Sequence, residues 1–353
     1  MNLKSIFLFT VISIMHCFSC SAVASTVLTY GEPGPNRGAR AGATKWFAEQ
    51  VEKRSGGDLK IKILWGGALY KATSSRQAIA AGVVDMGTII PDYFPKELVA
   101  FSLTNLPLGN LDPWVGLKAN FDHMRSDAVS NNLAQQNLVF VSSYMLSSVI
   151  VLCKGQAISS LDDIRDKKIR GVGTFGKIFG DLGANLVGMS IYKAYQGLDN
   201  GLLDCTQGYL NTTVALKHHE VADSLTKLNW GIYTGLGMFI NQQALRKLSP
   251  SQRQVLDEVA ADFIDYMGQD VMATDKRAEQ LLHSTDQGVD VQIIELPKAE
   301  SAKLMQASQW HINKWQQDAD DSGLDGKSLI NNYQSLLRKY TQERDEMGYP
   351  WAR

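Results

Sequence analysis

The sequence has little that would support catalysis, metal binding or nucleic-acid recognition. It contains only 6 histidines in 353 residues and no G-x-S-x-G motif to present a serine nucleophile. His218 and His219 are adjacent, so on a helix they point apart and cannot chelate one metal ion. Basic and acidic residues balance at 35 and 36, and no basic run offers a nucleic-acid site. We therefore expect no enzyme activity, no metal, no cofactor and no nucleic-acid partner.

Long apolar runs are also missing, except at the N-terminus. There, a basic residue precedes the apolar run 6–15, and the small-x-small pattern that signal peptidases cut ends at Ala24. The run is shorter than the roughly 20 residues that span a membrane. Residues 1–24 are thus predicted to be a secretory signal cleaved after Ala24, leaving a chain without direct membrane insertion. Cys20 leaves a lipid anchor open, although the residues before it fit that pattern poorly.

Cysteine is scarce, with 4 in the whole chain, and Cys17 and Cys20 fall within the predicted signal. Cys153 and Cys205 remain, each at the end of an apolar run typical of a strand. A pair of cysteines in an exported protein can form a disulfide. Two buried free thiols are the alternative, and the sequence leaves both open.

Patterns for strands and helices alternate through the rest of the chain, which indicates an α/β fold. The first 65 residues after the signal read β-α-β-α-β, because strand patterns at 27–30, 59–64 and 83–90 flank helical patterns at 39–53 and 74–81. Parallel pairing through right-handed crossovers is the expected result. Farther along we expect a helix over 114–137, strands at 138–143, 149–153 and 230–240, a long helix over 251–286, a strand at 289–296, and helices at 297–318 and 327–343.

The stretch 161–221 carries the clearest candidate site. Its pattern predicts strand, glycine-rich loop, two helices, a strand at 202–205 and a third helix, and Arg170 ends the first strand. The loop 171–176 matches G-x-G-x-x-G, but the acidic residue that a dinucleotide site needs about 20 positions later is missing. We interpret the glycines as bringing backbone amides close to a small anion. Arg170 would bind a carboxylate with its planar guanidinium.

Other candidates lie where strands end, because ligands bind at strand ends in open α/β sheets. Asp92 and Tyr93 directly follow the predicted strand 83–90, although a simple turn is the alternative. Phe175 and Trp230 fall near a strand end or a crossing between domains, where an aromatic side chain can equally be part of the core.

Several short motifs, weak alone but specific in their order and spacing, resemble the extracytoplasmic solute-binding proteins of tripartite ATP-independent periplasmic (TRAP) transporters. The likeness covers nearly the whole chain after the signal. The motifs are FAEQVE at 47–52, SGG at 55–57, GVVDMG at 82–87, LPL at 106–108, KIR at 168–170, LGA at 182–184, and GLLD at 201–204 with Lys217, Glu220 and Val221.

This resemblance implies a two-lobed periplasmic-binding-protein fold of type II with several interdomain crossings and a long helix bracing both lobes. Lobe I would comprise 25–148 and about 241–285, and lobe II 149–240 and about 286–296, with the C-terminal helices of 297–353 packed on the lobes. It also implies a periplasmic receptor for a small organic acid, working with the permease subunits of a TRAP transporter.

For the site, the resemblance makes Arg170 the arginine that pairs with the ligand carboxylate, and it places Gln207 and Asn211 on the cleft wall. The chain departs from the family pattern in several places. Trp230 stands where histidine is frequent, and 144–151 has no second arginine. These departures favour a smaller or partly apolar acid over a dicarboxylate or a sialic acid. A secreted small-acid enzyme and a periplasmic sensor subunit are the alternatives on this fold.

Overall fold

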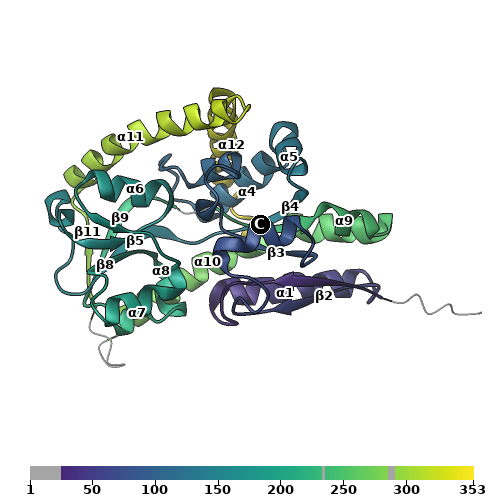
Figure 1. The fold of residues 1–353 in the computed structure, drawn as a ribbon, viewed down its shortest axis with the longest axis horizontal. Helices are drawn as coiled ribbons and strands as arrows, with labels where there is room; N and C mark the ends of the chain where they lie inside the picture. Colours follow the sequence, from purple (N-terminus) through teal and green to yellow (C-terminus); the bar gives the residue numbers. More distant parts are fainter. Residues whose placement is uncertain (1–24, 233–234, 285–290) are drawn as a thin grey trace, which may run out of the picture.

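The computed structural model describes residues 25–232, 235–284 and 291–353, and the predicted signal peptide lies outside them. These residues form two β-sheets, each covered by helices, which lie side by side along the long axis of the molecule (Figure 1). Within the described ranges, no helix is both long enough and apolar enough to cross a membrane.

The first sheet is built mainly from the N-terminal part of the chain. Its strand order is β2-β1-β3-β10-β4, with β1 Thr26–Gly31, β2 Leu59–Leu64, β3 Met86–Ile89, β4 Leu138–Tyr144 and β10 Leu236–Asn241. Strand β1 pairs in parallel with β2 and β3, as the alternating pattern predicts, and helix α1 (Gly38–Arg54) makes the first crossover. Strand β10 is antiparallel to both of its neighbours, β3 and β4.

The second sheet has the order β11-β9-β5-β8-β6-β7, with β5 Ser148–Cys153, β6 Lys168–Arg170, β7 Asn185–Val187, β8 Cys205–Tyr209, β9 Ser224–Ile232 and β11 Gln292–Glu295. The single strand predicted over 230–240 is wrong, because β9 and β10 belong to different sheets. The strand predicted at 202–205 is displaced, since Leu202 lies in an exposed turn and β8 starts at Cys205. The short, largely exposed edge strand β7 is not predicted, because its three residues show no strand pattern in the sequence.

The single helix predicted over 114–137 is two helices, α4 (Pro113–Met124) and α5 (Asp127–Ala134). The break falls at Ser126, whose backbone is extended at the start of α5. The remaining short helices are α2 Ser75–Ala80, α3 Val99–Ser102, α6 Gly173–Asp181, α7 Ala194–Asp199, α8 Leu210–Ala215 and α9 Gln242–Lys247.

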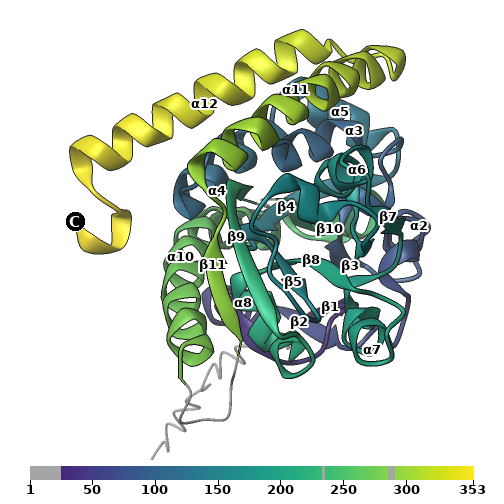
Figure 2. The same cartoon turned by 90° about the vertical axis from the view of Figure 1, so that its left-hand side faces the viewer.

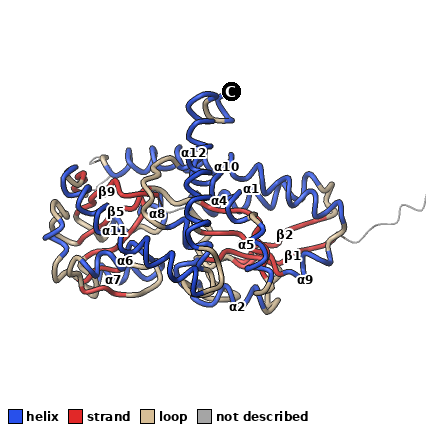
Figure 3. Tube along the Cα trace, turned by 90° about the horizontal axis from the view of Figure 1, so that it is seen from above, coloured by secondary structure: helices blue, strands red, loops and turns tan. Residues whose placement is uncertain are grey.

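Helix α10 (Pro250–Leu282) spans both halves of the molecule (Figure 3). Ser249 and Gln252 form a capping box at its start, with proline at the first helical position, as the sequence indicates. The N-terminal part packs on α1, α4 and β4 of the first half, and the C-terminal part packs on α8 of the second. Ala278 and Leu282 share an apolar cluster with Ile150 and Leu225 of the second sheet.

The chain passes between the halves from β4 to β5, from β9 to β10, and from α10 to β11. Helices α11 (Lys298–Asp321) and α12 (Gly326–Met347) follow, and Figure 2 shows α12 extending outward along α11. Helix α11 contacts α6 of the second half and α3 of the first. Within the second sheet, Cys153 on β5 and Cys205 on β8 are register partners and form a disulfide with an S–S distance of 2.06 Å.

Candidate functional site

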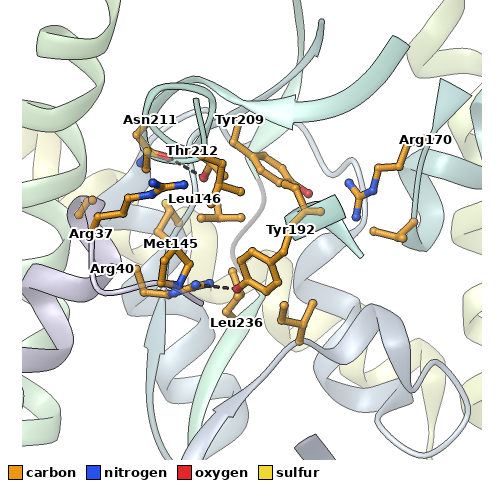
Figure 4. A pocket seen from close by; sticks show the side chains of 18 of the residues that line it. Arg37, Arg40, Met145, Leu146, Arg170, Tyr192, Tyr209, Asn211, Thr212 and Leu236 are labelled. Atoms are coloured by element: carbon orange, nitrogen blue, oxygen red, sulfur yellow. Dashed lines mark hydrogen bonds between the residues drawn. The ribbon is translucent and has the colours of Figure 1, made fainter. Parts of the chain in front are cut away.

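A pocket lies between the two halves, lined mainly by apolar side chains and by residues from both sheets (Figure 4). The first half contributes the loop after β1, the end of β3 and the β4–β5 crossing, and the second contributes the end of β6, the residues before α7, and α8. The lining residues are Pro35, Arg37, Gly38, Ala39, Arg40, Ile90, Tyr93, Met145, Leu146, Arg170, Val172, Ile191, Tyr192, Tyr209, Asn211, Thr212, Ala215, Leu216 and Leu236.

Arg170, the last residue of β6, is a buried cation at the pocket wall, only 1% exposed. Its Nε donates to the Met189 carbonyl at 3.0 Å and its Nη1 to the Gln207 carbonyl at 3.2 Å. No carboxylate of the described residues pairs with it. Two carbonyl dipoles orient a guanidinium but do not neutralise it, and an unpaired buried charge is costly. The site is therefore electrostatically prepared for an anion.

Gln207 supports Arg170 from behind the pocket wall. It is fully buried on β8, where its Oε1 accepts from the Val172 amide at 3.1 Å and its Nε2 donates to the Tyr209 hydroxyl at 3.1 Å. Its carbonyl accepts from Arg170 at the same time. One residue thus fixes the guanidinium, the loop after β6 and a tyrosine of the pocket.

A second arginine of the pocket, Arg40, is already neutralised. Its Nη2 lies 3.1 Å from Oε1 of Glu32, which is 1% exposed, and donates to the Tyr192 hydroxyl at 2.6 Å. The Glu32 carboxylate also accepts from the Gly34 amide and the Thr88 hydroxyl, both at 2.6 Å. Because Glu32 and Arg40 belong to the first half and Tyr192 to the second, this chain of hydrogen bonds links the halves across the pocket.

Three titratable groups near Arg170, namely Tyr192, Tyr209 and His218, are neutral at neutral pH. Burial raises the pKa of the Tyr192 hydroxyl to about 12, although Arg40 opposes that rise. Burial also raises the pKa of Tyr209 well above its ordinary value. His218 lies close behind, and burial followed by the repulsion of Arg170 lowers the pKa of its imidazole to about 4. None of these groups offers Arg170 a negative charge at neutral pH.

Three of the predicted site residues, Tyr93, Arg170 and Asn211, line this pocket. The Tyr93 hydroxyl accepts from the Ile191 amide of the opposite half at 3.4 Å, and Asn211 is 5% exposed at the start of α8. Gln207 lies one layer behind them.

Asp92 lies outside the pocket, at the start of α6. A Cβ placed on Gly173 would come within 2.2 Å of Asp92 Oδ2, so this carboxylate sits directly against the first residue of the helix. The glycine-rich loop therefore receives an anion that the protein itself supplies. Gly171 and Gly176 serve close backbone packing, since a Cβ on Gly176 would lie 2.6 Å from the Gly171 carbonyl carbon.

Phe175 and Trp230 lie in the core of the second half, away from the pocket lining. Their rings meet edge to face with centroids 4.7 Å apart, and the Trp230 indole donates to Ser308 Oγ of α11 at 2.7 Å. Both side chains are at most 1% exposed. The packing of α6 and α11 over β9 explains why both side chains are buried. An aromatic residue near a strand end can lie in the core or in a pocket wall, so the sequence alone does not decide between them.

Sequence reasoning missed Arg37, Arg40, Tyr192 and Tyr209. The rule that ligands bind at strand ends could have found three of them, because the two arginines follow β1 and Tyr209 ends β8. Tyr192 gives no such signal, since it enters the pocket from a short turn of 3-10 helix. Within 25–232, 235–284 and 291–353, no group of three or more histidines, cysteines and carboxylates could hold a metal ion.

Two sheets joined by several crossings, a long helix bracing both halves and a pocket between them define the class of two-lobed periplasmic binding proteins. Within that class, the chain belongs to the bacterial extracellular solute-binding protein family 7, whose model matches residues 33–318. Members of this family are the periplasmic solute-binding proteins of TRAP transporters, the family that the sequence motifs resemble.

Individual relatives are distant in sequence. A solute-binding protein of Albidiferax ferrireducens is 23% identical over 279 residues, covering 76% of each chain. A TRAP solute-binding protein from Rhodoferax ferrireducens, solved with copurified benzoate, superposes with a TM-score of 0.81 at 19% identity, covering 90% of this chain and 99% of that one. A marine metagenome protein specific for aromatic acids, solved with 3-hydroxybenzoate, gives 0.81 at 22% identity with the same coverage.

Proposed function

We propose that this protein is a periplasmic receptor that binds a small organic acid through Arg170 and delivers it to the membrane permease of a TRAP transporter. The buried Arg170 guanidinium, without a carboxylate partner among the described residues, carries this proposal. A ligand carboxylate supplies the missing charge and matches the planar donor pair. Export follows cleavage after Ala24, which N-terminal sequencing of the periplasmic protein would test.

The rest of the pocket favours an acid with an apolar body. Ile90, Met145 and Leu236 line it and are buried, and the phenol rings of Tyr192 and Tyr209 add flat apolar surface. The benzoate and 3-hydroxybenzoate bound by two structural relatives are acids of this kind. Tyr93 and Asn211 complete the wall, while Gln207, Phe175, Trp230 and Asp92 hold the wall in place from behind.

The proposal predicts that Arg170→Ala strongly weakens acid binding. Removing one member of a buried, hydrogen-bonded charge pair costs roughly 2–5 kcal/mol of affinity, or about 30-fold to several thousand-fold in Kd. Isothermal titration with protein freed of copurified ligand would measure this, using benzoate, 3-hydroxybenzoate and pyroglutamate as probes. Benzamide, which has the shape of benzoate without its charge, should not bind the wild-type protein measurably.

Arg165→Ala is the matched control, because Arg165 is an exposed arginine of the same segment whose distance to Asp162 is 3.9 Å. We expect it to bind as wild type does. If Arg170→Ala retained wild-type affinity for every acid that the wild-type protein binds, the assigned carboxylate site would be wrong.

A further inference from the structure

We propose that Tyr192 is a specificity residue of the pocket, and that its hydroxyl donates a hydrogen bond to a neutral oxygen atom on the body of the ligand. This inference rests on the proposed function and narrows the ligand to a monocarboxylic acid that carries a carbonyl, ether or hydroxyl oxygen. The sequence gives no sign of this role, because Tyr192 lies in the short 3-10 turn Ile191–Lys193.

The first support is the hydrogen bonding of the Tyr192 hydroxyl. A phenol oxygen can both accept and donate, whereas a guanidinium can only donate. In the 2.6 Å contact with Arg40, Nη2 is therefore the donor and the Tyr192 oxygen is the acceptor. The phenol proton is not used by that contact, and none of the described residues accepts it in a hydrogen bond. The proton is thus available to a molecule bound in the pocket.

The carboxylate beside this contact, Glu32, is already occupied by other donors. Its Oε1 accepts from the Gly34 amide at 2.6 Å and lies 3.1 Å from Arg40 Nη2. Its Oε2 accepts from the Thr88 hydroxyl at 2.6 Å. Burial raises the pKa of Tyr192 to about 12, so the hydroxyl keeps its proton at neutral pH. Because the charges of Glu32 and Arg40 cancel, the Tyr192 hydroxyl suits a neutral acceptor.

The second support is the position of the hydroxyl in the pocket. Figure 4 shows the Tyr192 ring between Arg40 and Arg170, with its hydroxyl at the end that faces Arg40. An acid whose carboxylate binds Arg170 would therefore meet this hydroxyl with another part of its body. Met145 and Leu236, both buried, line the same pocket. In such apolar surroundings a ligand oxygen gains a hydrogen bond, whereas a methylene group leaves the donor unsatisfied.

The third support is the fixed position of the turn that carries Tyr192. Ile191, the residue before it, is buried, and its amide donates to the Tyr93 hydroxyl of the first half at 3.4 Å. Ala194, the first residue of α7, is fully buried in a small apolar cluster. Arg40 fixes the hydroxyl itself. A donor held in this way loses little conformational freedom when a ligand binds, so it can discriminate between ligands.

Three pairs of acids test this, each with the same charge and nearly the same shape but with or without an oxygen on the body. They are 3-methoxybenzoate against 3-ethylbenzoate, 4-methoxybenzoate against 4-ethylbenzoate, and 4-oxopentanoate against 4-methylpentanoate. Titration calorimetry of the wild-type protein should give a preference of about 5-fold or more for the oxygen-bearing acid in at least one pair. In Tyr192→Phe that preference should fall below about 2-fold, because the ring stays and only the donor is lost.

The ratio within a pair separates this role from a structural one. Tyr192→Phe also removes the hydrogen bond from Arg40 that links the halves, but that loss weakens both acids of a pair equally. Tyr195→Phe is the matched control, because Tyr195 lies outside the pocket lining and its hydroxyl contacts Glu220 at 3.5 Å. It should keep the wild-type ratio, and circular dichroism should show the wild-type fold for both variants.

Three results would overturn the inference: no preference for oxygen in any pair, an unchanged ratio in Tyr192→Phe, or no binding of any of the six acids. Acids that still need Arg170 but show no such preference would remove the role of Tyr192 and leave the receptor proposal standing. Acid binding that survives Arg170→Ala would instead remove the receptor proposal.

Discussion

Glu32 is the residue that gives the pocket its charge balance. It lies within the chain of polar side chains that runs from Thr88 through Glu32 to Arg40 and Tyr192, and it is nearly inaccessible to solvent. Because Glu32 neutralises Arg40, Arg170 is the buried arginine of the pocket that has no carboxylate partner among the described residues. It also orders the loop after β1 through the Gly34 amide.

Glu32→Gln should destabilise the fold, because it keeps the shape of the side chain but leaves the Arg40 guanidinium without its counter-ion. Breaking a buried pair costs about 3–5 kcal/mol, and we expect the lower end because the Arg40 side chain is 17% exposed. The free energy of unfolding in urea measures the loss. Asp162→Asn, in an exposed pair at 3.9 Å, should change it by less than about 0.5 kcal/mol, and equal losses would contradict the role given to Glu32.

At the scale of single residues, the sequence predicts Arg170 as a site residue because a charged residue ends a buried strand, and in the structure Arg170 lies at the pocket wall. It does not tell which way Trp230 or Phe175 faces. That depends on α6 and α11 packing over the second sheet, a tertiary contact between segments far apart in the chain. Tyr192 gives no signal in the sequence either, because it lies in a short 3-10 turn rather than at a strand end or in a helix with a periodic pattern.

Among the elements, α6 carries the clearest constraint. Its first residue, Gly173, has φ +63° and lies against the Asp92 carboxylate of the opposite half. A carboxylate at a helix N-terminus is favourable, so this contact stabilises the arrangement of the two halves. The G-x-G-x-x-G spacing is typical of a ligand-binding loop, and here it accommodates a contact within the protein.

Gly173→Ala should cost about 1–3 kcal/mol in the free energy of unfolding, since it combines a left-handed backbone with a Cβ only 2.2 Å from Asp92 Oδ2. Thermal unfolding of the ligand-free protein would detect it. Gly188→Ala is the control, because a Cβ there meets nothing within 4 Å and the backbone is not left-handed. Equal unfolding temperatures for the two variants would show that the contact with Asp92 carries no weight.

Most elements follow from hydrophobic periodicity, including the long helix α10 with its capping box. The exceptions have physical causes. The run 230–240 is apolar throughout, and periodicity cannot tell where one buried strand ends and the next begins in another sheet. Strand β7 has three residues at a sheet edge, too few to show a pattern.

For the molecule as a whole, α10 passes the point where the halves meet. There the carboxyl group of Asp275 approaches Ser147, in the β4–β5 crossing, and the amide of Asn211 on α8. Burial raises the pKa of Asp275 to about 7, and hydrogen bonds from these two residues only partly oppose that rise. The Asp275 side chain of α10 thus lies next to the β4–β5 crossing and to Asn211 of the pocket.

This predicts a pH-dependent contribution of Asp275 to stability. Because the folded pKa of about 7 lies above the unfolded value near 4, the native state binds the extra proton, and stability falls as pH rises from about 4 to about 7. Asp275→Asn removes this fall, so wild type should lose on the order of 3 kcal/mol relative to the variant across that range. Urea unfolding at several pH values measures the difference, and a difference independent of pH would contradict the prediction.

The position of β10 has a consequence for the order in which the chain can fold during synthesis. β10 lies between β3 and β4, yet it is made only after the whole of β5 to β9. Until residue 241 has emerged, β4 has no partner in the first sheet, and Phe239 cannot reach Phe101 and Phe140. The N-terminal half therefore stays incomplete while two thirds of the chain is made.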